Sequence, residues 1–67
     1  MTWNYRVISK NGELAIHEVF YHEDGSVSGY TDTPVYPRAS SIQELSEELR
    51  RYAEALEREV LPHEAAA

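Results

Sequence analysis

The chain has 67 residues, of which 42% are hydrophobic and 27% are charged, and its formal net charge is −6 at pH 7. This length leaves room for one domain only, and the composition is too apolar for a disordered chain. The negative charge repels phosphate backbones and anionic lipids, so it disfavours direct binding to nucleic acid and favours a basic protein partner.

The core of so short a chain must be thin. Below about 70–80 residues, apolar burial only just offsets the conformational entropy that folding removes. The chain contains no cysteine, so disulfides are excluded and the commonest zinc ligand is missing. Self-association is the remaining means of support, and a homodimer is therefore an open prediction.

The sequence also bears on location. The first 20 residues do not have the pattern of a signal peptide. No apolar run approaches the roughly 20 residues that span a bilayer. We therefore expect a soluble, cytoplasmic protein without membrane contact.

Strand patterns fill the first half of the chain. Residues 2–9 and 14–22 are rich in aromatic and β-branched side chains with polar residues between them. Asn11-Gly12 separates them and is the strongest short signal for a hairpin, because both positions tolerate positive φ. After a turn at Glu23-Asp24-Gly25, a third and weaker strand is predicted at about 26–31.

A two-residue loop at Asn11-Gly12 determines which side chains share a face. It places Ser9 opposite Leu14 and Val7 opposite Ile16, whereas the register of the second hairpin is left open. The face expected beneath the helix carries Trp3, Tyr5, Val7, Leu14, Ile16, Phe20 and Val27. The other face carries Arg6, Ile8, Ala15, His17, Val19, Tyr21 and Tyr30.

A connector and one helix complete the predicted architecture. Proline residues hold the connector at 32–40 extended, and whether it adds an edge strand is left open. Ser41 and Glu44 have the spacing of a capping box, which predicts a helix over about 41–61 and a tail at 62–67. Apolar residues three or four apart form one stripe on this helix, namely Ile42, Leu45, Leu49, Tyr52, Ala53, Leu56 and Val60.

These elements predict an α+β fold. A three-stranded antiparallel β-meander is followed by one C-terminal amphipathic helix, in the order β-β-β-α, and the helix packs on one face of the sheet. The opposite face is not cleanly polar, as a solvated face would be. We therefore predict an interaction surface made of Ile8, His17, Val19, Tyr21 and Tyr30, and the alternative is ordinary scattered surface aromatics.

Catalytic and metal-binding patterns are weak. His17 and His22 lie five residues apart in one predicted strand, so their side chains point to opposite faces and cannot share a metal. We predict no catalytic residue, no metal site and no cofactor. The leading hypothesis is a small non-enzymatic protein-binding or regulatory module. The alternative is a small ligand-binding protein or enzyme that uses His17 and Glu18.

Several segments carry a resemblance to a known group of proteins. They are Trp3-Asn4-Tyr5-Arg6-Val7-Ile8, Ile16-His17-Glu18-Val19-Phe20-Tyr21, Glu23-Asp24-Gly25, Pro34-Val35 and Ser41-Ile42-Gln43-Glu44-Leu45. In these segments the chain resembles a family of short bacterial proteins of unassigned function. That resemblance covers most of the chain and implies no activity.

Residues 28–56 are more distantly similar to the small domain of HicB-type antitoxins, in which a strand, a proline-containing connector and a capped helix follow in this order. The resemblance implies a partial ribonuclease-H-like β-β-β-α unit that binds a small basic toxin. The acidic charge of this chain is compatible with such a partner. The connector departs from the antitoxin pattern because it lacks the usual Leu-Pro-Gly stretch.

Overall fold

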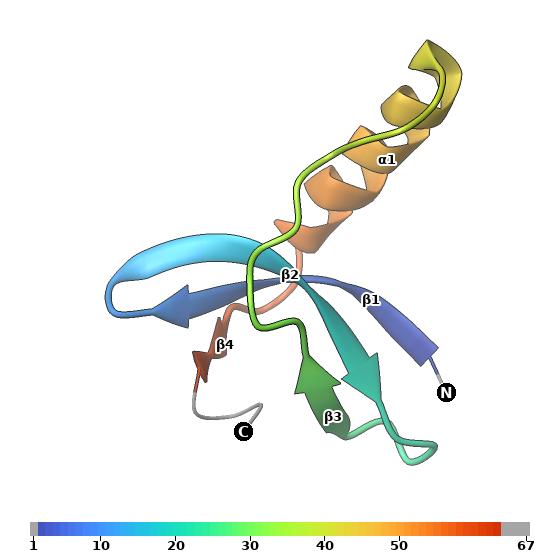
Figure 1. Ribbon diagram of the computed structural model, residues 1–67. Helices are drawn as coiled ribbons and strands as arrows, with labels where there is room; N and C mark the ends of the chain where they lie inside the picture. Colours follow the sequence, from blue (N-terminus) through green and yellow to red (C-terminus); the bar gives the residue numbers. More distant parts are fainter. Residues whose placement is uncertain (1, 64–67) are drawn as a thin grey trace.

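A computed structural model describes residues 2–63 and shows an α+β fold with one helix and one curled sheet (Figure 1). The sheet has four strands in the order β3-β2-β1-β4. Its strands are β1 (Thr2–Lys10), β2 (Glu13–Tyr21), β3 (Val27–Tyr30) and β4 (Leu61–Pro62), and the helix is α1 (Ile42–Ala55). The α+β class is as predicted, whereas the sheet has a fourth strand.

The first hairpin confirms the predicted register. β1 and β2 pair with Ser9 opposite Leu14 and Val7 opposite Ile16. Asn11 and Gly12 have φ values of 53° and 80°, the left-handed conformation that a two-residue hairpin loop requires. This turn fixes the faces of both long strands.

The second hairpin contains an irregularity that the sequence left open. Tyr30 pairs with Val19, but a register shift follows, and Tyr21 pairs with Val27. Directly paired residues share a face, so Val27 lies with Tyr21 and not on the predicted helix side. The turn itself is held by Asp24, whose carboxylate accepts hydrogen bonds from the backbone nitrogen and hydroxyl of Ser26.

The connector does not form an edge strand. Between Tyr30 and the helix it makes isolated contacts with β2, in which the Thr31 amide donates to the Glu18 carbonyl and the Val35 amide donates to the Ile16 carbonyl. Ser41 then caps α1 as predicted, since its hydroxyl accepts from the Glu44 amide at 3.1 Å.

The prediction that the helix extends to about residue 61 is wrong. The helix ends at Ala55, and a turn follows in which the Leu56 amide donates to the Ala53 carbonyl. Leu61 then pairs with Ile8 in a parallel arrangement, so Leu61 and Pro62 form β4 where a helix end and tail were predicted. Residues 64–67 of the predicted tail lie outside the described residues.

Tertiary contacts explain this early helix end. The Arg6 guanidinium donates to the Glu59 carbonyl at 2.6 Å and so holds the chain after the helix against β1. A helix continued to residue 61 would lose this bond and the pairing of Leu61 with Ile8. Tertiary contacts therefore outweigh the helical pattern in this stretch.

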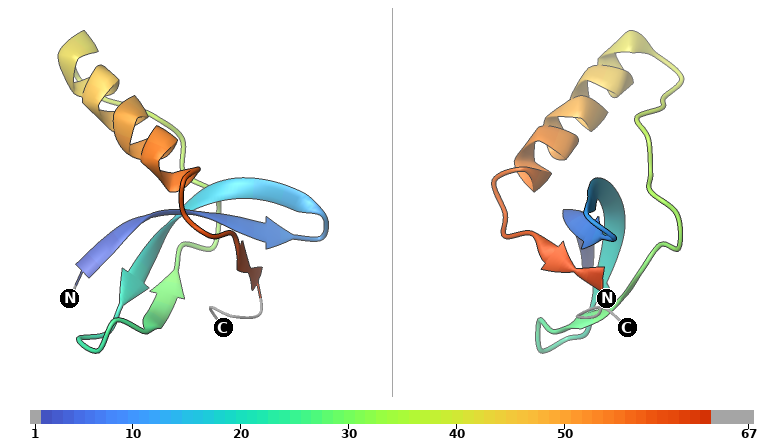
Figure 2. Two further views of the ribbon diagram at one scale, coloured as in Figure 1. Left: turned by 180° about the vertical axis from the view of Figure 1, so that it is seen from behind. Right: turned by 90° about the vertical axis from the view of Figure 1, so that its left-hand side faces the viewer.

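The length of the helix and its orientation relative to the sheet also differ from the prediction. Fourteen residues make a helix of about 21 Å. α1 meets the sheet near its C-terminal end and projects away from it, so it does not cover the face from end to end (Figures 1 and 2). Within residues 2–63, no helix is long and apolar enough to cross a membrane.

Candidate interaction site

The concave face of the sheet is occupied by the chain's own core. Val19 and Ile8 have exposed fractions of 0% and 1%, and His17 is also buried. Tyr21 and Tyr30 are half-buried. The five residues predicted as an interaction surface are brought together on one side, but as a largely buried cluster and not as an exposed patch.

The curl of the sheet causes this burial. The Tyr30 hydroxyl, at the end of β3, donates to the His63 carbonyl at 3.1 Å and also contacts Nδ1 of the His63 ring. His63 directly follows β4, so this contact joins the two edge strands of the sheet. The rings of His17 and His63 both meet Tyr30 edge-on, with centroids 5.5 and 5.7 Å away. A flat three-stranded sheet would have left this face open.

The two residues of the alternative hypothesis, His17 and Glu18, do not share a site. The His17 Nδ1 lies 2.8 Å from the Thr31 carbonyl oxygen. His17 and Asp32 both line a cavity of about 450 Å³. Glu18 points to the other face of the sheet, where it is the cross-strand partner of Tyr5, and it lines a different cavity. The structure therefore offers no centre that uses both side chains.

α1 is fixed to the convex face through β1. The Tyr5 hydroxyl donates to the Glu48 carboxylate at 2.5 Å, and the Tyr5 ring packs against Tyr52 with centroids 4.6 Å apart. Trp3 packs edge-on against Tyr5, with centroids 5.2 Å apart. Ala55 is fully buried at the end of the helix. The inner face of α1 is thus defined by Glu48, Tyr52 and Ala55.

A second apolar face of α1 remains uncovered. Leu56 follows α1 as its C-cap residue, and Ile42, Leu49 and Leu56 have exposed fractions of 83%, 49% and 69%. They are spaced seven residues apart and form a line that we call the outer stripe. At 3.6 residues per turn, Leu49 lies about 120° around the helix from Ala55.

The outer stripe was predicted to pack on the sheet, together with the rest of the helix's apolar positions. Seven-residue spacing alone does not separate it from the packed residues, because Leu45 and Tyr52 are also seven residues apart. Leu45 and Tyr52, which lie between its members along the chain, are half-buried. The outer stripe is therefore the largest apolar feature that α1 leaves exposed.

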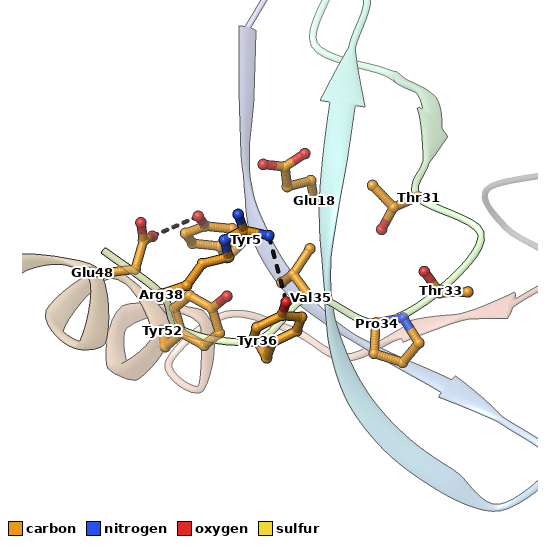
Figure 3. Close-up of a pocket in the computed structure, with 10 residues that line it drawn as sticks. All are labelled: Tyr5, Glu18, Thr31, Thr33, Pro34, Val35, Tyr36, Arg38, Glu48 and Tyr52. Carbon is orange, nitrogen blue, oxygen red and sulfur yellow. Dashed lines mark hydrogen bonds between the residues drawn. The ribbon is translucent and has the colours of Figure 1, made fainter. Parts of the chain in front are cut away.

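A cavity of about 260 Å³ lies where α1, the sheet and the connector meet (Figure 3). Glu18 from β2 and Glu48 from α1 line it together with Arg38 from the connector. Three tyrosine rings complete its main lining, namely Tyr5, Tyr36 and Tyr52.

The charged residues that line this cavity, two glutamates and one arginine, give it a net negative charge. Burial, the hydrogen bond to Glu48 and the charges of Glu48 and Glu18 raise the pKa of Tyr5 well above its ordinary value. Burial and the same two carboxylates also raise the pKa of Tyr52. A nearby anion disfavours the phenolate form, so both tyrosines stay neutral at physiological pH.

The described residues 2–63 contain no cluster of three or more histidine, aspartate or glutamate side chains that is arranged to hold a metal ion. Comparisons with protein-family models, with curated proteins and with solved structures found no match to this chain. The two resemblances drawn from the sequence stay predictions.

Proposed function

We propose that this protein is a non-enzymatic protein-binding module that associates with a second copy of itself through the outer stripe of α1. The observation that carries this proposal is the exposure of Ile42, Leu49 and Leu56 on one line of a projecting helix. Their regular spacing is what a helix partner requires, because side chains seven residues apart meet a second helix along one seam.

The marginal stability of a helix as short as α1 supports the need for a partner. An isolated helix shorter than about 12–15 residues is marginal in water, and most helices depend on the packing of an apolar face. α1 has 14 residues, of which Glu48 and Tyr52 make the contacts with Tyr5 of β1 described above and Ala55 is fully buried. The N-terminal turns extend beyond the sheet (Figure 2). A second helix along the outer stripe would cover these turns.

The geometry of the outer stripe favours a second copy as that partner. Ile42 and Leu56 lie seven residues on either side of Leu49. A two-fold axis at Leu49 with antiparallel helices places Leu49 against its own copy and Ile42 against Leu56 of the other chain. The outer stripe is then complementary to its own copy, so no partner of different sequence is needed.

Charge favours the antiparallel arrangement. The first half of α1 carries Glu44 and Glu47, besides Glu48 on the inner face, whereas Arg50, Arg51 and Glu54 follow Leu49 and leave the second half with a net positive charge. Antiparallel pairing brings the acidic half to the level of the partner's arginines, and parallel pairing sets acidic halves side by side. The antiparallel form also pairs opposite helix dipoles.

Sedimentation equilibrium of the full chain and of two variants tests the proposal. We expect a monomer–dimer equilibrium whose dissociation constant rises at least about tenfold in Leu49→Gln, since a buried leucine is lost from the axis. Leu14→Gln makes the same chemical change at an exposed site on β2 and should leave the equilibrium unchanged.

A chain that stays monomeric up to millimolar concentration would overturn self-association. Equal weakening by both substitutions would overturn the role of the outer stripe. The basic partner that the negative charge favours, including a small toxin of the kind bound by HicB-type antitoxins, is tested by adding a basic amphipathic peptide to the monomeric chain. If the chain binds that peptide and Leu49→Gln does not, the occupant of the outer stripe is a basic partner and not a second copy.

A further inference from the structure

We propose that the cavity between α1, β1, β2 and the connector binds a small organic cation, of the guanidinium or methylated-ammonium class. It is lined by the carboxylates of Glu18 and Glu48 and by the rings of Tyr5, Tyr36 and Tyr52 (Figure 3). This site lies on the inner side of α1, so it is separate from the outer stripe.

The aromatic lining supplies the first part of the recognition. The face of a tyrosine ring attracts a cation through its quadrupole when the charge lies within about 6 Å of the ring centre. Tyr5 and Tyr52 are in contact with each other, with centroids 4.6 Å apart, and Tyr36 comes from the connector. Rings from three separate elements therefore border the same cavity.

The carboxylates supply the second part. Glu48 accepts the Tyr5 hydroxyl with one oxygen, which leaves its second oxygen available. Glu18 is half-buried and lies opposite Tyr5 in the sheet. Burial is the main cause of the raised pKa values of Tyr5 and Tyr52, and the charges of Glu48 and Glu18 raise them further. A cation would lower the cost of holding two like charges in a partly desolvated space.

Arg38 indicates the shape of the cation. Its guanidinium carbon lies 5.8 Å from the centre of the Tyr36 ring, and a guanidinium nitrogen donates to the Tyr36 hydroxyl at 3.4 Å. The chain thus already places one organic cation at the edge of the cavity. Arg38 is exposed and lies on the irregular connector, so its side chain can leave at little cost.

Arg38 therefore acts as a built-in competitor. A second cation beside it would feel like-charge repulsion, and binding requires the Arg38 side chain to move away from the cavity that it lines. The cavity volume of about 260 Å³ is below the range typical of drug-sized ligands. The ligand is accordingly a single cationic group, either on a free molecule or at the end of a basic side chain.

Nuclear magnetic resonance titration of the full chain tests this site. The probes are methylguanidinium chloride and tetramethylammonium chloride, and sodium chloride at equal ionic strength is the reference. We expect saturable shifts at Tyr5, Glu18 and Tyr52 with at least one organic cation and none with sodium.

Variants give the test its specificity. Glu18→Gln should weaken binding about fivefold or more, because one of the two negative charges that line the cavity is lost. Glu57→Gln removes the same charge from an exposed residue that does not line the cavity, and should leave binding within about twofold. Arg38→Ala should strengthen binding about threefold, because the competitor is removed.

Three results would overturn the site. They are the absence of saturable shifts, equal weakening by Glu18→Gln and Glu57→Gln, and weaker binding in Arg38→Ala. A short arginine-containing peptide identifies the source of the cation. Much tighter binding of the peptide than of methylguanidinium assigns the cation to a protein side chain, and equal binding assigns it to a free molecule. Either result supports the cation site and is independent of dimer formation.

Discussion

Tyr5 of β1 and Glu48 of α1 are joined by a hydrogen bond of 2.5 Å across 43 residues of sequence. The bond connects the first strand to the inner face of the helix, where Tyr52 also packs on the Tyr5 ring. A hydrogen bond with an ionised acceptor is shorter and stronger than a neutral one. This contact therefore determines which face of α1 meets the sheet and which face is left for a partner.

Removing the Tyr5 hydroxyl tests the strength of this connection. We expect Tyr5→Phe to lower the free energy of unfolding by about 1–2 kcal/mol, since a partly buried, charge-assisted bond is lost while the ring stays. Chemical denaturation measures the change. Tyr36→Phe removes the hydroxyl of an exposed ring and should cost less than about 0.5 kcal/mol. Equal losses in the two variants would contradict the assigned role of Tyr5.

Alkaline pH should weaken the fold. The pKa of Tyr5 and that of Tyr52 are raised above the ordinary value of 10.0 in the folded chain. Above about pH 10 the unfolded chain therefore binds fewer protons than the folded chain, and the free energy of unfolding falls as the pH rises. Denaturation between pH 8 and 11 measures this slope. Tyr5→Phe should make it shallower, and an unchanged slope would argue against this linkage.

Burial on the concave face predicts a large cost for a small change at Val19. Val19→Ala removes two methyl groups from a fully buried side chain, and we expect a loss of about 2 kcal/mol in unfolding free energy. Val60→Ala makes the same change at a side chain that is 43% exposed and should cost less than about 0.5 kcal/mol. If Val19 tolerates the change as well as Val60, the concave face is not the core.

The first turn offers a test of backbone conformation. Gly12 has a φ of 80° and no atom within 4 Å of an added Cβ, so Gly12→Ala costs only conformational strain, about 1–2 kcal/mol. Gly29 has equal space and no positive φ, and Gly29→Ala should leave stability unchanged or raise it by up to about 1 kcal/mol. Thermal unfolding compares the two variants. The reverse ranking would contradict the described turn.

Local patterns predicted the first hairpin well. Asn11-Gly12 determines a two-residue loop by its own conformational preference, and the register of β1 and β2 follows from the loop. The Ser41 cap was predictable for the same reason, because the hydroxyl acts on a residue three positions away. Both features depend on neighbours in sequence.

Features that depend on distant contacts were not predictable. β4 has two residues, one of them Pro62, and its existence rests on the pairing of Leu61 with Ile8. The same closure buries His17 and Val19, which the alternating pattern placed on an open face. The outer stripe was hidden because residues that pack on β1 and residues that stay exposed have the same hydrophobic pattern on the helix.

Disulfide cross-linking of Leu49→Cys tests self-association through the outer stripe most directly. The chain has no cysteine, so any disulfide formed by this variant joins two copies at residue 49. Two-fold antiparallel pairing at Leu49 brings the two cysteines within the roughly 4 Å between Cβ atoms that a disulfide spans. We predict near-complete oxidised dimer for Leu49→Cys and only background cross-linking for Leu14→Cys. Equal cross-linking of the two variants would contradict the account.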